Sequence, residues 1–186
     1  MKKHILTYPK SFLQLLILIS TCLFSCSDLG TSTSIEVLFP AEHYDEALDG
    51  RMILLISKDL ESEPRFQLRD DSKTCQGFGM DVTDWNPNEA LPFDMNAFGY
   101  PIQNFNDLPD GEFYVQVVFH KYETFNRADG LVVKLPMDRG EGQQWNRAPG
   151  NIYTIPHKIT ITESNQIINI QLDQIIPSIE EPEDTK

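Results

Sequence analysis

The segment Met137–Asn151 holds the residues of this chain whose types and spacing most suggest a binding site. Its only tryptophan, Trp145, is surrounded by side chains that donate or accept hydrogen bonds: Gln143, Gln144, Asn146 and Arg147. An indole ring can stack on a sugar ring, while amide and guanidinium groups can bond sugar hydroxyls or peptide groups. These five residues are therefore our candidate site for a carbohydrate or a peptide.

The same segment can instead be a structural connection between strands. In that alternative Trp145 fills the edge of the fold with its indole N–H bonded, and the charged side chains of the loop pair with nearby groups, namely Arg139, Arg147, Asp138, Glu141 and Asp129. We expect this alternative, in which Trp145 is buried. Gly140, Gly142 and Gly150 suit tight turns, so the loop is expected to be ordered in either case.

Metal sites and catalytic centres have little support in the sequence. The histidines His43, His120 and His157 are isolated, without the spacing of zinc ligands. Asp138 and Glu141 are candidates for calcium, but no EF-hand pattern is present. No carboxylate pair can be singled out as catalytic, because spacing along the chain does not give the separation in space. We therefore predict no cofactor and no catalytic residue.

The N-terminus carries a targeting signal. Lys2 and Lys3 precede the apolar run Phe12–Phe24, which is shorter than the ~20 residues of a membrane-spanning helix and has the layout of a secretory signal. The next residues, Leu23-Phe24-Ser25-Cys26, resemble a bacterial lipobox. This resemblance implies a signal peptide over residues 1–25, cleavage before Cys26, and acylation of its thiol and new N-terminus with chains such as palmitate. An ordinary cleaved signal is the alternative.

A lipidated Cys26 would hold the protein at a membrane of the cell envelope, because two or more acyl chains anchor stably where one is marginal. Residues 26–34 are small and polar and are predicted to be a flexible tether. Neither the membrane, inner or outer, nor its face can be assigned. Only Cys75 then remains in the folded part, which excludes an internal disulfide, and it is expected to be a small packed side chain.

The chain is acidic, with a formal net charge of −13. Losing residues 1–25 removes three lysines and no acids, so the mature chain is more negative still. Such a surface repels phosphate backbones, and nucleic acid is not expected as a partner. Residues 175–186 hold a concentration of acids near the end and are predicted to be a disordered tail.

Short apolar runs of period two, separated by Gly, Pro, Asn and Asp, predict an all-β fold over residues 35–174. The expected strands are Ile35–Phe39, Arg51–Ser57, Arg65–Leu68, Phe78–Val82, Glu112–Lys121, Leu131–Leu135, Lys158–Thr162 and Gln166–Leu172, the last two joined as a hairpin. Roughly seven or eight such strands indicate an antiparallel β-sandwich, immunoglobulin-like in broad outline, with long ordered loops. The long connection Asp84–Leu108 is rich in aromatic residues and is expected to pack on the sandwich.

Several stretches resemble the β-sandwich domain that precedes the catalytic domain in secreted esterase-like proteins of the enterochelin-esterase type. They are Glu63–Phe66, Phe98–Pro101, Leu108–Gln116 and Ala128–Asn151. This resemblance implies an accessory domain, since the relatives continue into an α/β-hydrolase domain. The serine of such a hydrolase lies in a G-x-S-x-G turn, and this sequence contains none.

The sequence thus predicts a membrane-anchored, non-enzymatic binding or accessory module of the cell envelope. The alternative is a subunit or accessory domain of an esterase-type hydrolase whose catalytic domain is encoded separately. Its expected partners are the lipid bilayer and a carbohydrate, a peptide or such a hydrolase.

Overall fold

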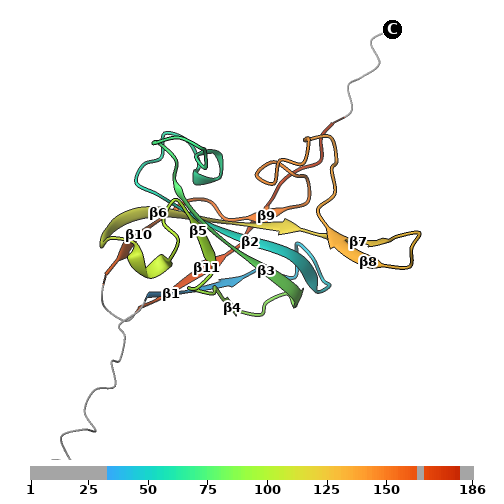
Figure 1. The fold of residues 1–186 in the computed structure, drawn as a ribbon. Helices are drawn as coiled ribbons and strands as arrows, with labels where there is room; N and C mark the ends of the chain where they lie inside the picture. Colours follow the sequence, from blue (N-terminus) through green and yellow to red (C-terminus); the bar gives the residue numbers. More distant parts are fainter. Residues whose placement is uncertain (1–32, 163–165, 181–186) are drawn as a thin grey trace, which may run out of the picture. The chain divides into compact units, whose positions relative to one another are not determined.

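The computed structural model describes residues 33–162 and 166–180 (Figure 1). Its regular structure is almost entirely β. The only helices in these two ranges are the 3-10 turns η2 (Pro64–Phe66) and η3 (Phe105–Asp107), and no helix there is long and apolar enough to cross a membrane. The signal peptide, Cys26, nearly all of the tether and the end of the acidic tail lie outside the described residues.

Within the described ranges the strands form three sheets. The central sheet has the order β12-β9-β6-β2-β3-β5, with β10 also pairing with β6; the small sheet has the order β11-β1-β4; and β7 pairs with β8 alone. The strands are β1 (Thr33–Leu38), β2 (Leu48–Ser57), β3 (Gln76–Trp85), β4 (Leu91–Pro92), β5 (Phe98–Tyr100), β6 (Gly111–Lys121), β7 (Glu123–Asn126), β8 (Val132–Leu135), β9 (Ile152–Tyr153), β10 (His157–Ile161), β11 (Gln166–Gln171) and β12 (Gln174–Ile175). All their pairings are antiparallel except that of β1 with β11.

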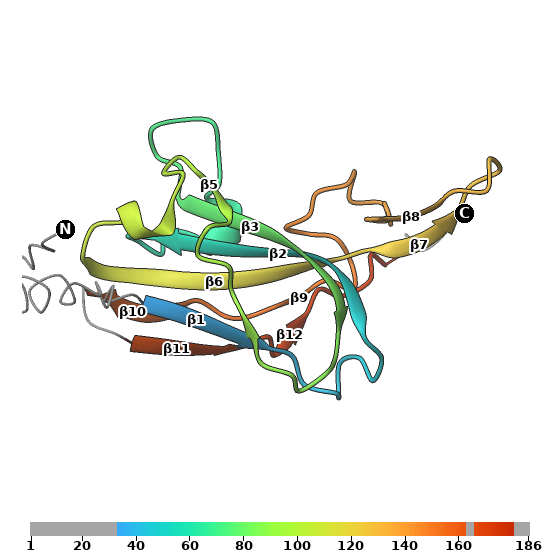
Figure 2. The ribbon, with the colours of Figure 1, turned by 60° about the horizontal axis from the view of Figure 1, so that its bottom comes forward.

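The main core lies between the small sheet and one face of the central sheet, which form two layers (Figure 2). Alternate residues of β1, β2, β3 and β6 meet there and are almost completely buried. Trp85 lies at the centre of an aromatic group, with ring centroids 4.7 Å from Phe39 and 5.2 Å from Phe119. The predicted all-β antiparallel sandwich is confirmed, while its immunoglobulin-like outline stays a prediction.

Among the residues that the structure describes, no sheet packs on the second face of the central sheet, called the open face below. Along β2, Met52 and Leu54 point into the main core, while Arg51, Ile53 and Leu55 point to the open face. A smaller cluster of Leu55, Cys75 and Val118 forms on this face. Segment 58–75, which includes η2, and loop 137–151 cover part of it, so their placement decides what remains accessible.

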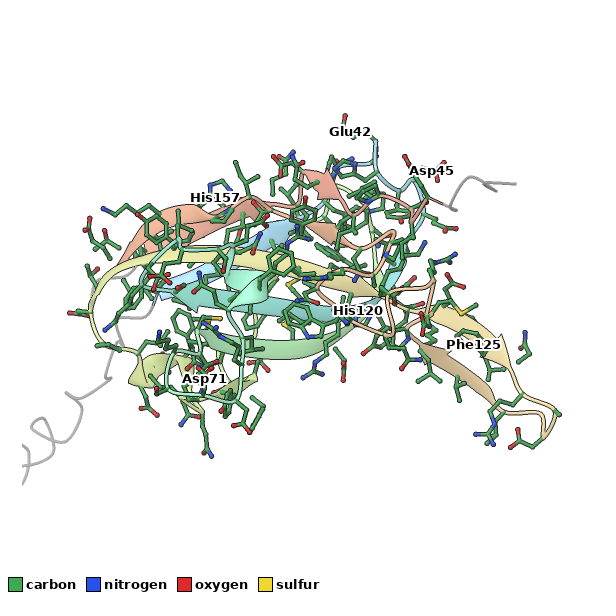
Figure 3. The ribbon with its side chains drawn as sticks, turned by 90° about the horizontal axis from the view of Figure 1, so that it is seen from above. Glu42, Asp45, Asp71, His120, Phe125 and His157 are labelled. Carbon is green, nitrogen blue, oxygen red and sulfur yellow. The ribbon has the colours of Figure 1, made fainter. Side chains whose placement is uncertain are left out.

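The β7–β8 hairpin projects from the body of the fold, continuing the direction of β6 (Figures 1 and 2). Phe125 lies out along this hairpin, and His120 lies near its base, close to the end of β6 (Figure 3). The loop 137–151 returns from the hairpin to β9 and so lies beside the open face at this end of β6.

Two predicted elements are wrong. Arg65–Leu68 is not a strand: Pro64 has no N–H for a ladder and begins the 3-10 turn η2 instead. Residues 158–172 are not a hairpin, because β10 pairs with β6 in the central sheet whereas β11 pairs in parallel with β1 in the small sheet. The long connection Asp84–Leu108 contains β4, β5 and η3; its Phe93 and Phe105 are buried as expected, but Phe98 and Tyr100 are exposed.

Candidate ligand-binding groove

A groove of about 310 Å³ lies on the open face of the central sheet. This volume is at the lower end of the ~300–1,000 Å³ typical of small-molecule sites. The groove is lined by residues of β2, β3, β5 and β6 and of two loops: Arg51, Ile53, Leu68, Gly77, Phe78, Gly79, Phe98, Tyr100, His120, Gln143 and Trp145.

The strand register sets the order of these side chains. Phe98 of β5 lies opposite Gly79 of β3, which lies opposite Ile53 of β2, so one row crosses the floor. The neighbouring row on one side contains Tyr100 and Gly77, and Leu68 lies against this glycine. The row on the other side runs from Asp81 through Arg51 to His120. The groove therefore has an apolar floor and an apolar end, with its polar groups at the opposite end.

Two aromatic side chains of the edge strand β5 form one wall of the groove. Phe98 is 69% exposed and Tyr100 is 42% exposed. The Tyr100 hydroxyl donates a hydrogen bond to Asp70 Oδ1 at 3.1 Å, which fixes the ring at the edge of the sheet. Large aromatic side chains exposed next to a groove are characteristic of interaction sites rather than of ordinary surface.

Trp145 forms the opposite wall. It is partly buried, and it packs against the cluster of Leu55, Cys75 and Val118 on the open face. Our expectation of a buried Trp145 with a bonded indole N–H is wrong: one part of the ring contacts the sheet, another part lines the groove, and no described residue accepts a hydrogen bond from Nε1. Trp145 therefore packs against the sheet and also borders the groove.

The polar end is built around Arg51. Its Nη1 lies 2.8 Å from Asp81 Oδ1, and its Nη2 donates to the carbonyl of Gly79 at 3.2 Å. A Cβ at position 79 would lie 2.7 Å from Nη2, so only glycine lets the guanidinium lie flat across β3. The charge of Arg51 is thus compensated, and its plane is fixed beside the groove.

His120 completes this end. It is 8% exposed, and burial lowers its pKa from the ordinary value, against the opposing effect of Glu141. The imidazole is therefore held towards its neutral form, in which one nitrogen donates and the other accepts a hydrogen bond.

Loop 137–151 is attached to the sheet and to η2 by partly buried polar contacts. Asn151 accepts a hydrogen bond from the Lys121 N–H at 3.0 Å and donates one to the Trp145 carbonyl at 2.7 Å. Arg65 of η2 donates to the Asn146 carbonyl at 3.2 Å, and the Asn146 amide donates back to the Arg65 carbonyl at 3.0 Å. The backbone from the Trp145 carbonyl to Asn146 is therefore held in place.

The η2 turn is held in place by Gln116 of β6, which is fully buried. Its Oε1 accepts from the Arg65 N–H at 2.9 Å, and its Nε2 donates to Glu63 Oε2 at 2.7 Å and to the Thr154 carbonyl at 2.9 Å. The Arg65 guanidinium lies over the rings of Phe66 and Tyr153, at 4.6 and 4.1 Å from their centroids. η2 is thus a rigid neighbour for loop 137–151.

Of the candidate site residues, the structure brings Trp145 and Gln143 to the groove. Gln143 has a φ of +59°, a left-handed conformation that is uncommon for a residue other than glycine, asparagine or aspartate. Gln144 is exposed outside the lining, Asn146 bonds Arg65, and the Arg147 guanidinium lies 5.5 Å from the Phe66 ring centroid. These three residues hold or flank the loop instead of lining the groove.

The calcium candidates organise the loop. Asp138 Oδ1 accepts hydrogen bonds from the N–H groups of Gly140 and Gly142 at 2.9 and 3.3 Å, and Glu141 Oε2 accepts from the Arg139 N–H at 2.8 Å. Glu141 Oε1 is buried without a hydrogen-bond partner. Residues 33–162 and 166–180 contain no group of three or more His, Cys, Asp or Glu side chains that could hold a metal ion.

The remaining reactive groups lie apart. His43 and His157 do not line the groove. The Nε2 atom of His157 lies 2.8 Å from the Oγ1 atom of Thr154. Cys75 is buried, which raises its pKa to about 12 and keeps it a neutral thiol. This is the packed side chain that the sequence predicts, and a neutral thiol is a poor nucleophile.

No protein-family model, curated protein or solved structure matches this chain.

Sequence reasoning singled out two of the eleven lining residues and missed the other nine, among them Arg51, Ile53, Phe98, Tyr100 and His120. Two signals could have indicated some of them. Gly77 and Gly79 alternate around Phe78 inside a strand, which is a sign of close approach by another group. Phe98-Gly99-Tyr100 places two aromatic rings on one face of an extended segment.

Proposed function

We propose that this protein is a lipoprotein of the bacterial cell envelope that binds a carbohydrate or a peptide in the groove on its open sheet face, without catalysing a reaction. The observation that carries the binding function is the pair of aromatic walls, with Phe98 and Tyr100 on one side and Trp145 on the other. The polar end with Arg51 and His120 gives the site a direction, because a ligand can place its polar groups only there.

Rigidity supports a binding site. The backbone around Trp145 is fixed by Asn146 and Asn151, and the Arg51 guanidinium is fixed by Asp81 and the Gly79 carbonyl. A ligand therefore meets side chains that are already in place, and less conformational entropy is lost on binding.

The proposed anchor rests on the sequence Leu23–Cys26. Its test is metabolic labelling of cells with a clickable fatty acid. Wild-type protein is expected to incorporate the label and to fractionate with membranes, and Cys26→Ala is expected to lose the label. A Cys26→Ala protein that still carries the label would contradict the anchor and leave the groove proposal in place.

The binding function is tested by applying the purified full-length protein in detergent to arrays of immobilised glycans and of synthetic peptides. We expect specific binding that is lost in Phe98→Ala. The matched control is Ile167→Ala on β11, which removes an equally exposed side chain, 62% accessible, from the small sheet. Equal loss in both variants, or no binding on either array, would contradict a site in the groove.

A second proposal is an accessory subunit of an esterase-type hydrolase encoded separately. The observation in its favour is that three of the stretches that carry the resemblance meet at one place: η2 bonds loop 137–151, and Phe98 and Tyr100 line the same groove. A G-x-S-x-G hydrolase in the neighbouring reading frame would favour it. Hydrolysis of short acyl esters by the purified protein alone would contradict the non-enzymatic function in both proposals.

A further inference from the structure

We infer that the ligand of the groove is a neutral carbohydrate, bound with a sugar ring between Phe98 and Trp145 and its hydroxyls directed to Arg51, His120 and Gln143. This inference rests on the proposed binding function and selects among its ligands. Charge, backbone accessibility and shape each favour a neutral sugar.

The lining has no uncompensated charge to attract an ion. Arg51 is the only residue of the lining with a permanent charge, and its guanidinium is paired with Asp81 at 2.8 Å. His120 is held towards the neutral form by burial. An anionic ligand would also approach a chain whose formal net charge is −13. A ligand with many hydroxyls and no charge is the best match for paired or neutral donors and acceptors.

The floor of the groove is poorly suited to strand addition by an extended peptide. Peptides that bind to sheets usually add a strand to an open edge, and their affinity comes from main-chain hydrogen bonds. The floor of this groove is made by β2 and β3, and each of these strands already pairs with a neighbour on both sides. Only side-chain faces are therefore offered to a ligand over the floor.

The floor between the two aromatic walls is low. Gly77 and Gly79 carry no side chains, and the space above them is filled by Leu68 and by the Arg51 guanidinium. A sugar ring presents its C–H face to an aromatic ring and its hydroxyls at its edges. The volume of about 310 Å³ suits a short stretch of an oligosaccharide and not a protein domain.

The test is a titration of the full-length protein in detergent with candidate ligands. Binding is measured by calorimetry and by saturation-transfer NMR. The probes are a series of neutral hexose and pentose oligosaccharides, oligogalacturonate as the acidic counterpart, and the peptides of the array. We expect at least one neutral oligosaccharide to bind roughly tenfold more tightly than oligogalacturonate. Saturation transfer should be strongest at the C–H protons of one ring face.

Two variants link the result to the groove. Phe98→Ala should weaken binding of the neutral sugar by roughly tenfold or more, because it removes one aromatic wall, and Ile167→Ala should leave the affinity unchanged. Arg51→Met should also weaken binding of the neutral sugar, and its binding of oligogalacturonate should stay weak. Together these results would support the inference.

Other results would overturn it, in two distinguishable ways. If peptides or oligogalacturonate bind more tightly than every neutral sugar and Phe98→Ala abolishes that binding, the inference on the ligand is wrong and the binding function stands. If no probe shows binding that depends on Phe98, both the inference and the proposed binding function are wrong.

Discussion

Arg65 and Asn146 are 81 positions apart in the chain and bond each other twice, each side chain donating to the backbone carbonyl of the other residue at 3.2 and 3.0 Å. This reciprocal pair joins the η2 turn to the loop next to Trp145. One wall of the groove therefore depends on a residue, Arg65, that does not line it.

Arg65→Ala is expected to lower the free energy of unfolding by about 2–4 kcal/mol. The variant loses the contacts with the Phe66 and Tyr153 rings, the ion pair with Glu63 at 2.9 Å and the bond to Asn146. Chemical denaturation followed by circular dichroism measures the change.

Arg139→Ala is the matched control for Arg65→Ala. Its side chain is 49% exposed and pairs with Glu123 at the surface, so a cost of only about 0–1 kcal/mol is expected. Equal losses in the two variants would show that η2 does not hold the loop as described.

Gln116→Leu keeps the approximate volume of the side chain and removes all of its hydrogen bonds. The variant leaves the Arg65 N–H, the Thr154 carbonyl and one oxygen of Glu63 without this partner in a buried site. We expect a loss of about 3 kcal/mol or more in the free energy of unfolding. Gln171→Leu, at an exposed position of β11, should change it by less than about 0.5 kcal/mol, and a similar loss there would contradict the assignment.

The sandwich itself could be predicted from the sequence because apolar and polar residues alternate along its strands. In β6 the residues Phe113, Val115, Val117 and Phe119 fall on one face, and this face is the main core. The pairing of strands could not be predicted from this alternation. β10 and β11 are adjacent in the chain, yet they join different sheets, because the partners that bury their apolar faces come from distant segments.

The candidate site could likewise be predicted only in part. Composition indicated Trp145 and Gln143, since the loop around them is rich in residues that suit recognition. Phe98 and Tyr100 were expected to pack down, because exposed aromatic rings are unfavourable in general. Their exposure follows from the pairing of β5 with the edge of β3, opposite two glycines, and sequence periodicity does not report this register.

Protonation of His120 should make the fold less stable in acid. Burial lowers its pKa in the folded state below the ordinary value of 6.5, so between these two values the unfolded chain binds more protons than the folded chain. The free energy of unfolding should therefore fall as the pH drops through 6.5 and level off, for this group, below the pKa of the folded state.

Denaturation of His120→Gln across pH 5–8 measures this contribution, since the variant should lose part of the slope near pH 6. An unchanged slope in His120→Gln would show that this residue does not couple folding to protonation.

Cys75 should resist alkylation in the folded protein. Its side chain is buried, and its pKa of about 12 leaves almost no thiolate at pH 8. Peptide mapping after treatment with iodoacetamide should find Cys75 unmodified in buffer and fully modified in guanidinium chloride. Rapid modification in buffer would mean that segment 58–75 opens readily and that the cluster behind Trp145 is not stably packed.

The central claim is that the exposed aromatic wall binds a ligand, and the most direct test is the affinity of Phe98→Ala for whichever array ligand the wild type binds. Because Phe98 is 69% exposed, its removal should leave the melting temperature within about 2 °C of the wild type. The affinity should fall by roughly tenfold or more, as expected for an aromatic residue at the centre of a site. An unchanged affinity at an unchanged melting temperature would contradict the account.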